Sequence, residues 1–397
     1  MTVLAFDWNA TRVRGVVGRA GEMPLPMPLE PPHFELPLAI GLDHKPDVGA
    51  SALARCRSAS RQTCASFLPH LGSAKRWHTL NAEGACDLIW QRLQSPASSA
   101  RAVVLTLPAY LQNAQADALR KLGEKSRLPM LGSISTLLAA ALAGHALHYW
   151  QRSVLVIDAD DHAMSLGWVK GLADRAHLIE ARSFTQLGVR AWKERQIDAL
   201  SDRFIREHRR DPRDVPSAEQ SIFDQLDALA LAALTRRPMQ VGVNGTQWFK
   251  HLLVRPEHTI HHCRALAQQA AQEAAQLLTC WPKTEMPPAI LVTHQASRLP
   301  GFIDALRPLL AEPASSTSET ILPPTRVTGV EFEDFGEDLL VEETPTRHVM
   351  VLTPEAPAQA AHGLVRQFRS GALPAGHVDK IVPMGPALPK RAGEMPG

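Results

Sequence analysis

Two short apolar runs in this sequence each end in an aspartate and lead into a further apolar segment. Val3 to Phe6 is followed by Asp7, and a second run with valines on both sides of Gly15 begins a few residues later. The run from Ser153 to Ile157 is followed by Asp158 in the same way. Short runs of β-branched and apolar residues predict strands, and two such runs in close succession predict a hairpin. The repeated pattern of strand, aspartate and hairpin indicates a fold with two related lobes.

The chain is long enough for two lobes and a cleft between them. Its 397 residues exceed the size at which a single hydrophobic core keeps growing. A content of 45% hydrophobic and 21% charged residues is ordinary for a globular protein, which excludes general disorder. We place an N-terminal lobe at residues 1–150, a C-terminal lobe at 151–375 and a tail at 376–397. Pro, Ser, Thr and Glu dominate residues 312–346, so we expect an irregular insertion there.

Charge and cysteine content limit the partners and the compartment. Lys and Arg number 42 against 40 for Asp and Glu, and a net charge of +2 gives no electrostatic case for nucleic acid. The five cysteines have no C-x-x-C pair and no spacing suited to zinc, which predicts a reducing cytoplasm and no structural metal. The start of the chain has no recognisable signal peptide, and no apolar run approaches the roughly 20 residues that cross a bilayer. We therefore expect no membrane partner.

Strand and helix patterns alternate along the chain, which predicts the α/β class. Apolar runs at residues 102–107 and 289–292 predict buried strands. Helical spacing of apolar residues, or a high content of helix formers, predicts helices at 112–126, 137–149, 189–209 and 258–281. Residues 50–68 also fit a helix, whereas the prolines between 22 and 32 exclude one there.

The most specific stretch reads L-T-L-P-A-Y-L-Q-N-A-Q from Leu105 to Gln115, and L-L-A-A-A-L-A follows at 137–143. Together they resemble the V-P-A-Y-F-x-x-x-Q and T-A-A-A-L-A segments of the heat-shock-70 (DnaK-type) family. Further similar segments follow in order at 154–158, 184–211 and 290–300 and after Pro354, so the resemblance covers nearly the whole chain. It implies the actin-like ATPase (ribonuclease H-like) fold, with two lobes that each contain a mixed sheet and flanking helices and close on ATP and magnesium. The family's peptide-binding domain has no room here.

The resemblance also assigns nucleotide contacts to the two hairpins. The first reads D-W-N-A-T where the family has D-x-G-T-T, so Asp7, Asn9 and Thr11 stand at phosphate-binding positions. Asn tolerates a left-handed backbone, so we expect this loop to be damaged rather than abolished. The second hairpin reads D-A-D-D-H-A-M-S where the family has D-x-G-G-G-T-x-D, which adds Asp158 and Asp160. Asp7 and Asp158 are candidate magnesium ligands; alternatively, they are strand-end carboxylates retained by descent.

Several departures from the family weigh against ATP hydrolysis, and we assign no catalytic residue. Every glycine of the second loop is gone, and a carboxylate about 4 Å from a phosphate is repelled by roughly 1 kcal/mol in water and more in a semi-buried cleft. Thr136 replaces the catalytic glutamate, and threonine is no general base near neutral pH. The segment 67–72, similar to the one with the family's catalytic lysine, has no lysine before Gly72. Bulky residues 293–295 would crowd the adenosine, and 230–233 lack the family's cations.

Two other groups have the residue types of a metal site. Asp160, Asp161 and His162 at one hairpin tip suit a divalent ion, although a solvated turn is the simpler interpretation. His258 and His262 lie four residues apart on one helix face, but no second pair of ligands is nearby, so ordinary surface or core histidines are the alternative.

Two functions remain open from the sequence. The first is a divergent heat-shock-70-like nucleotide-binding domain that binds ATP or ADP weakly, with magnesium, or is a pseudo-ATPase. It would act through an unknown partner protein. The second is an active ATPase or a sugar-kinase-like phosphotransferase that uses Asp7, Thr11, Asp158 and a metal. We favour the first because the apolar segments match the family while the glycines, the base and the lysine do not.

Overall fold

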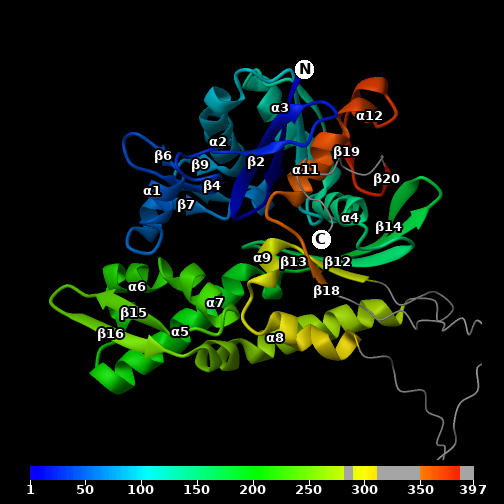
Figure 1. Cartoon of the computed structure of the whole chain (residues 1–397). Helices are drawn as coiled ribbons and strands as arrows, with labels where there is room; N and C mark the ends of the chain where they lie inside the picture. The colour runs from blue at the N-terminus through cyan, green and yellow to red at the C-terminus, as the bar shows by residue number, and fades with distance from the viewer. Residues whose placement is uncertain (281–288, 311–348, 385–397) are drawn as a thin grey trace, which may run out of the picture.

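Strands and helices alternate throughout the part of the chain that the computed structural model describes, residues 1–280, 289–310 and 349–384. They form a mixed α/β fold around two main sheets (Figure 1). The predicted insertion at 312–346 and the end of the predicted tail, 385–397, lie outside these residues. No helix within them is both long and apolar enough to cross a membrane.

The first sheet has the order β19-β11-β10-β1-β2-β3, with β4 paired to β2. Strand β1 is antiparallel to β2 and parallel to β10, as expected for an N-terminal hairpin beside a later buried strand. Because side chains alternate along a strand, Phe6 and Trp8 pack on one face of β1 while Ala5 and Asp7 belong to the other. The strands are β1 (Thr2–Trp8), β2 (Arg12–Arg19), β3 (Leu25–Met27), β4 (Glu35–Pro37), β10 (Ala102–Leu107), β11 (Met130–Ser135) and β19 (His377–Val378).

The second sheet repeats this arrangement, with the order β18-β17-β12-β13-β14-β20. Its consecutive strands β12, β13 and β14 are antiparallel, and β17 and β18 are parallel to β12, as β10 and β11 are to β1. The duplication predicted from the two aspartate hairpins therefore holds at the level of strand order. The strands are β12 (Ser153–Ala159), β13 (Met164–Leu172), β14 (Arg175–Phe184), β17 (Ala289–Val292), β18 (Val349–Val351) and β20 (Ile381–Pro383).

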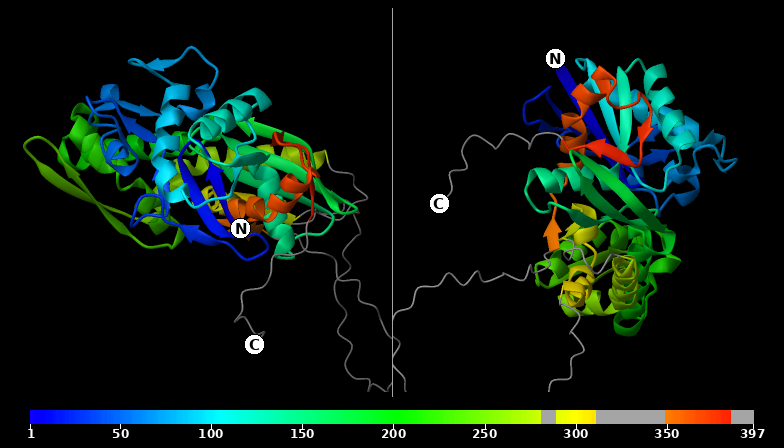
Figure 2. Two further views of the ribbon diagram at one scale, coloured as in Figure 1. Left: turned by 90° about the horizontal axis from the view of Figure 1, so that it is seen from above. Right: turned by 90° about the vertical axis from the view of Figure 1, so that its right-hand side faces the viewer.

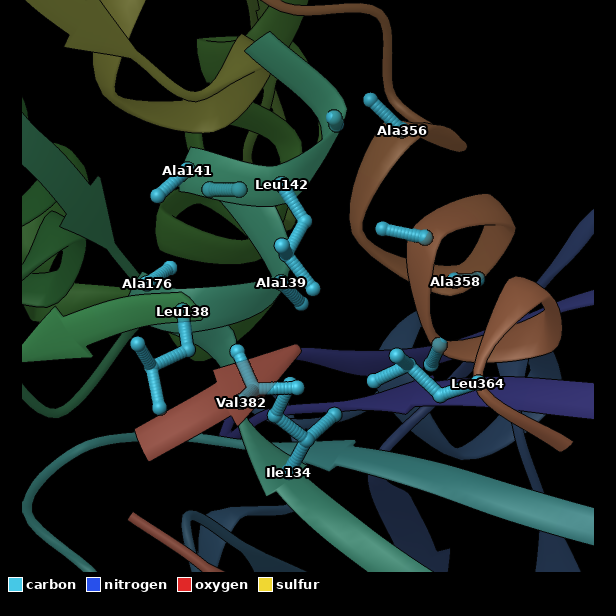
Figure 3. Close-up of a cluster of buried hydrophobic side chains, with 14 of the residues drawn as sticks. Ile134, Leu138, Ala139, Ala141, Leu142, Ala176, Ala356, Ala358, Leu364 and Val382 are labelled. Atoms are coloured by element: carbon cyan, nitrogen blue, oxygen red, sulfur yellow. The ribbon is translucent and has the colours of Figure 1, made fainter. Parts of the chain in front are cut away.

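Two helices pack between the sheets and against each other: α4 (Thr136–Ala146) and α11 (Ala356–Gly363). Helix α4 lies on β12, β13 and β14, whereas α11 lies on β1, β2 and β10. Figure 3 shows Leu138 and Leu142 of α4 in the shared core with Ala358 and the nearby Leu364. Small alanine side chains let the helices approach each other and the sheets closely. This core joins the two halves of the molecule, which are the first sheet with the elements around it and the second sheet with the elements around it.

Other helices cover the outer faces of the sheets. Side chains of α2 (Ala82–Ala97) and α3 (Asn113–Lys125), including Trp90 and Leu119, pack on the Trp8 face of the first sheet. Side chains of α5 (Val189–His208), α8 (Pro256–Thr279) and α10 (Phe302–Leu306), including Trp192 and Phe302, pack on the second sheet. The two halves, blue to cyan and green to yellow, lie one above the other in the right-hand view of Figure 2.

Each half also has a smaller group of elements. In the first half, β5 (Ala39–Gly41), β6 (Asp47–Val48) and β7 (Thr63–Ala65) form a sheet beside α1 (Ala50–Leu53). The short hairpin of β8 (Arg76–Trp77) and β9 (Leu80–Asn81) follows. In the second half, α6 (Pro216–Phe223), α7 (Leu226–Leu234) and the hairpin of β15 (Met239–Asn244) and β16 (Phe249–Val254) share a separate core with α5.

Two sequence predictions differ from the structure. The predicted helix at 50–68 is wrong, because only Ala50–Leu53 is α-helical and residues 63–65 pair with β5 instead. Residues 349–384, which we assigned to the second lobe and the tail, are shared between the halves. Helix α11 packs on the first sheet and β19 pairs with it, whereas β18 and β20 join the second sheet. Buried apolar side chains on α11 require the first sheet as their cover.

Candidate functional site

The first hairpin turn is held together by the side chain of Asn9. Its Oδ1 accepts hydrogen bonds from the backbone N–H groups of Thr11 and Arg12, each at 3.0 Å. The side chain therefore closes the turn on itself, as Asn commonly does in turns. Asn9 does not have a positive φ, so the turn does not use the left-handed backbone that Asn tolerates. The turn keeps its shape by this local bonding rather than by replacing glycine conformation.

The second hairpin turn is organised around the carboxylate of Asp160. This residue is only 2% exposed, and its Oδ1 accepts from the backbone N–H groups of His162 at 2.9 Å and Ala163 at 3.0 Å. Its Oδ2 accepts from the Tyr110 hydroxyl at 2.6 Å. The interpretation of this tip as a solvated turn is wrong for Asp160, because these bonds hold the carboxylate inside the protein.

The two hairpin turns touch each other directly. The backbone N–H of Ala10 donates to Asp160 Oδ2 at 2.8 Å, and the backbone N–H of Asp161 donates to the Thr11 hydroxyl at 2.9 Å. Asp160 thus bonds to both hairpins at once. Backbone N–H groups in such turns are suited to anions, and the anion they meet here is a carboxylate of the same chain.

Asp7 and Asp158 lie at corresponding positions of the two sheets and affect each other electrostatically. The Thr106 hydroxyl donates to Asp7 Oδ1 at 2.6 Å, and the Thr293 hydroxyl donates to Asp158 Oδ1 at 2.9 Å. Burial raises the pKa of Asp7, against the effect of the Thr106 bond. Burial, with repulsion from Asp7 and then Asp160, raises the pKa of Asp158 to about 7. Burial also raises the pKa of Asp160, to about 6.

These carboxylates form an acidic centre at which a divalent cation would relieve repulsion. Two carboxylates with water could hold Mg²⁺, which often binds proteins through only one or two carboxylates. No group of three or more His, Cys, Asp or Glu with metal-site geometry occurs in the described ranges. The Asp160, Asp161 and His162 tip and the His258 and His262 pair are thus not assembled as such sites there.

The position expected for adenosine is nearly filled by side chains. A cavity of about 20 Å³ lies between α5, α7 and α9 (His294–Ser297), next to Trp192, Ala230 and Gln295. That is room for about one water molecule, far less than a nucleoside needs. Of residues 293–295, Gln295 lines this cavity. Thr136, which stands where the heat-shock-70 family has its catalytic glutamate, begins α4. Its buried hydroxyl has no hydrogen-bond partner among the described residues.

Basic side chains on β2 face the same centre, and the sequence analysis missed them. Arg12 and Arg14 share one carboxylate, Glu35, at 3.0 and 3.1 Å. Arg12 is 6% exposed, and two of its nitrogens, Nε and Nη2, have no hydrogen-bond partner. Burial, followed by the charges of Arg14, Arg298 and Arg12, lowers the pKa of His294 to about 4. The sequence signal for this placement was the two-residue period of a strand, which puts Arg12 and Arg14 on one face. Arg14 is the cross-strand partner of Asp7, so that face is the one with Asp7.

A clamp between the halves joins the turn after α1 to α6, which lie opposite each other in Figure 1. Arg57 pairs with Glu194 of α5 and, at 3.1 Å, with Glu219 of α6. Gln220 Oε1 accepts from the Arg57 backbone N–H at 2.7 Å, and its amide nitrogen donates to the Leu53 carbonyl at 3.4 Å. Nothing in the sequence pattern predicted this pairing, because it joins residues more than 130 positions apart.

Beneath this clamp lies an open cleft of about 680 Å³. Residues of both halves line it, including Lys75 and Trp77 on one side and Arg190 and Phe223 on the other. Asp161 and His162 at the second hairpin tip also line the cleft, but Asp7 and Asp158 do not. Lys75 comes after Gly72, so it lies outside the segment 67–72 that is similar to the one with the family's catalytic lysine.

No family model matches this chain, and no curated protein is similar to it at a significant level. The resemblance to the heat-shock-70 family therefore rests on the sequence motifs alone.

Proposed function

We propose that the chain has the actin-like ATPase fold in its heat-shock-70-like form and serves as a non-hydrolysing domain that acts through a partner protein. The repeated strand order of the two sheets supports the fold, because the resemblance implies two lobes with a mixed sheet in each. Helices α4 and α11 between the sheets supply the connection that two such lobes need. Fold alone does not decide function, which depends here on whether the two hairpin turns can bind a phosphate.

The carboxylate of Asp160 is the observation that carries this proposal. It accepts hydrogen bonds from Ala10 of the first hairpin and from Ala163 of the second, the kind of backbone donors that a triphosphate would need. A phosphate at this position would have to displace a buried carboxylate that has four donors. It would also meet the charges of Asp7 and Asp158 without any glycine-rich loop to bind it.

The rest of the nucleotide position supports the same conclusion. The space at the adenosine position is about 20 Å³, and Thr136 offers no general base. If nucleotide is bound at all, it is bound weakly and with magnesium at Asp7 and Asp158. Interaction with a partner is the function left to such a scaffold. Phe249 and Leu253 on β16, 61% and 57% exposed, are apolar side chains that a partner could cover.

A phosphotransferase is the second candidate, and one observation favours it. A carboxylate with a pKa of about 7 is well matched to general-base catalysis at neutral pH, and Asp158 has that value. However, Asp158 does not line the 680 Å³ cleft, so a substrate bound there would not reach this carboxylate in the present arrangement. We therefore favour the non-hydrolysing domain.

Calorimetric titration of the full chain with ATP and ADP, with and without magnesium, tests the proposal together with a phosphate-release assay. We expect no turnover and, at most, magnesium-dependent binding in the millimolar range. Asp7→Asn and Asp158→Asn serve as variants of the acidic centre. ATP hydrolysis that either variant abolishes would establish the enzyme instead, and transfer to a hydroxyl substrate would favour the second candidate.

A further inference from the structure

The cleft of about 680 Å³ is within the size range of small-molecule sites, whereas the adenosine position is not. Its walls come from both halves of the chain and are about equally polar and apolar in character, so they suit a polar ligand. Arg57 and Glu194 of the clamp that joins the halves are among the lining residues. The chemistry of the walls indicates which ligand fits.

Positive charge exceeds negative charge on these walls. Four side chains, Arg57, Lys75, Arg190 and Lys193, are cations, against the two carboxylates of Asp161 and Glu194. Arg57 and Lys193 are already paired, with Glu219 and with Asp227 at 3.1 Å. These two therefore have less to offer a ligand than the cations that remain.

Lys75 and Arg190 keep donors for a ligand, one on each side of the cleft. Arg190 has only a distant contact, 3.8 Å, with Glu194, and its side chain is 64% exposed. The Lys75 ammonium contacts His70 Nε2 at 2.8 Å, which occupies one of the donors of that group. Its positive charge acts on other lining residues: after burial it lowers the pKa of His70, and after burial and the charge of His70 it lowers the pKa of His162. A phosphate, with charge near −2 and three acceptor oxygens, matches cations on two sides.

The Trp77 and Phe223 rings of the cleft already have cations over them, and the imidazoles of His70 and His162 already contact the rings of Trp77 and Tyr110. Lys75 Nζ lies 5.0 Å from the centre of the Trp77 ring. Arg57 and Lys193 lie 5.0 and 5.3 Å from the centre of the Phe223 ring. Rings engaged in this way offer less surface for stacking on a nucleobase. The cleft therefore favours an anion without a base.

The remaining polar groups suit hydroxyl groups of a ligand. Ser60 and Thr185 line the cleft with hydroxyls, and Asp161 with a carboxylate. The buried Asp161 Oδ1 has no hydrogen-bond partner, so a donor that reached it would remove an unsatisfied acceptor.

We propose that this cleft binds a phosphorylated, hydroxylated small molecule without a nucleobase, in the class of the sugar phosphates, with its phosphate at Lys75 and Arg190. Asp7 and Asp158 do not line this cleft, so the proposal does not require ATP or magnesium to be bound at the acidic centre.

Calorimetric titration of the full chain with ribose 5-phosphate tests this, with AMP, ribose and inorganic phosphate as matched titrants. We expect saturable binding of ribose 5-phosphate, and at least about tenfold weaker binding of ribose, since a lost charged hydrogen bond alone costs about that factor. Inorganic phosphate should bind more weakly because it lacks the sugar hydroxyls, and AMP because its base finds no free ring to stack on. Lys75→Gln and Arg190→Gln, both at exposed positions, should each weaken it at least about tenfold. Lys121→Gln, at an exposed position on α3, should not.

The opposite results overturn the proposal. Absence of ribose 5-phosphate binding in the millimolar range, or binding no tighter than that of inorganic phosphate or ribose, would remove the ligand class. AMP binding as tight as that of ribose 5-phosphate would remove the exclusion of a base. Binding that survives both substitutions would place the ligand elsewhere.

Discussion

A buried carboxylate is stable only where donors surround it, and Asp160 shows how a phosphate position can be filled from within. Its four donors come from two hairpins and from Tyr110, so the side chain connects segments up to 150 residues apart. Burial still raises its pKa to about 6, because the bonds offset only part of the desolvation cost. The residue therefore serves as an internal anion at some cost in free energy.

Removal of this internal anion should create a site for an external one. In Asp160→Ala, four donors lose their acceptor, and we expect the free energy of unfolding to fall by about 2–4 kcal/mol. Sulfate can then occupy the vacated position, so thermal unfolding of the variant should shift upward in sulfate relative to chloride by more than in wild type.

Asp160→Asn is the matched control, since the amide retains the size of the side chain and leaves no room for the ion. Equal sulfate effects in wild type, Asp160→Ala and Asp160→Asn would contradict the role of Asp160 as an internal anion.

Asp158 predicts a dependence of stability on pH. Its pKa rises from 3.8 to about 7 on folding, so the folded state binds the proton more tightly than the unfolded state. Its contribution is therefore most favourable below pH 4 and is lost as the pH rises to 7, by up to about 4 kcal/mol. Asp158→Asn, which cannot ionise, should be more stable than wild type at pH 8 and similar at pH 4. Urea unfolding in chelator-containing buffer measures this.

Asp174→Asn controls for charge removal, because the Asp174 side chain is 83% exposed. A gain in stability at pH 8 that Asp174→Asn reproduced would exclude burial of Asp158 as the cause.

At the scale of elements, two neighbouring arginines separate contacts within one half from contacts across the cleft. Arg55 pairs with Asp43 and Asp47 of its own half, whereas Arg57 reaches Glu194 and Glu219 of the other. Arg57→Ala removes the ion pairs but keeps the backbone bonds to Gln220, so it should loosen the turn after α1 from α6, and amide hydrogen exchange in residues 53–63 and in α6 should become faster. Arg55→Ala should leave exchange in α6 unchanged. If both variants gave the same exchange pattern in α6, the clamp would not be specific to Arg57.

The sequence predicted the elements with strong local patterns and missed those that depend on distant partners. The continuous apolar runs of β1, β10, β12 and β17 were predictable because buried parallel strands are apolar on both faces. Residues 63–65 were predicted to be helical from local propensity. They form a strand because pairing with β5, more than 20 residues away, overrides that propensity. The positions of Asp7 and Asp158 followed from strand ends. The bond from Ala10 to Asp160 did not, since it depends on how the two hairpins meet.

At the scale of the whole molecule, the chain crosses between the halves more than once. Helix α4 leads from the first sheet to the second, and after β18 the chain returns to the first sheet as α11 and β19 before β20 joins the second. The core that includes Leu142, Leu364 and Val382 therefore belongs to both halves (Figure 3). Each half also has a core of its own on the outer face of its sheet, so the shared core is what couples the two.

This shared core predicts that the two halves unfold together. Calorimetry should give one transition, with equal van't Hoff and calorimetric enthalpies, although chains of this size often show several. Leu364→Ala, at a position that is 3% exposed, should lower the free energy of unfolding by about 2–5 kcal/mol and shift the whole transition. Leu253→Ala, at a position that is 57% exposed, should change it little. If Leu364→Ala split the transition in two, with one part unshifted, the halves would unfold independently, and α11 would be a cover for the first sheet rather than the link between them.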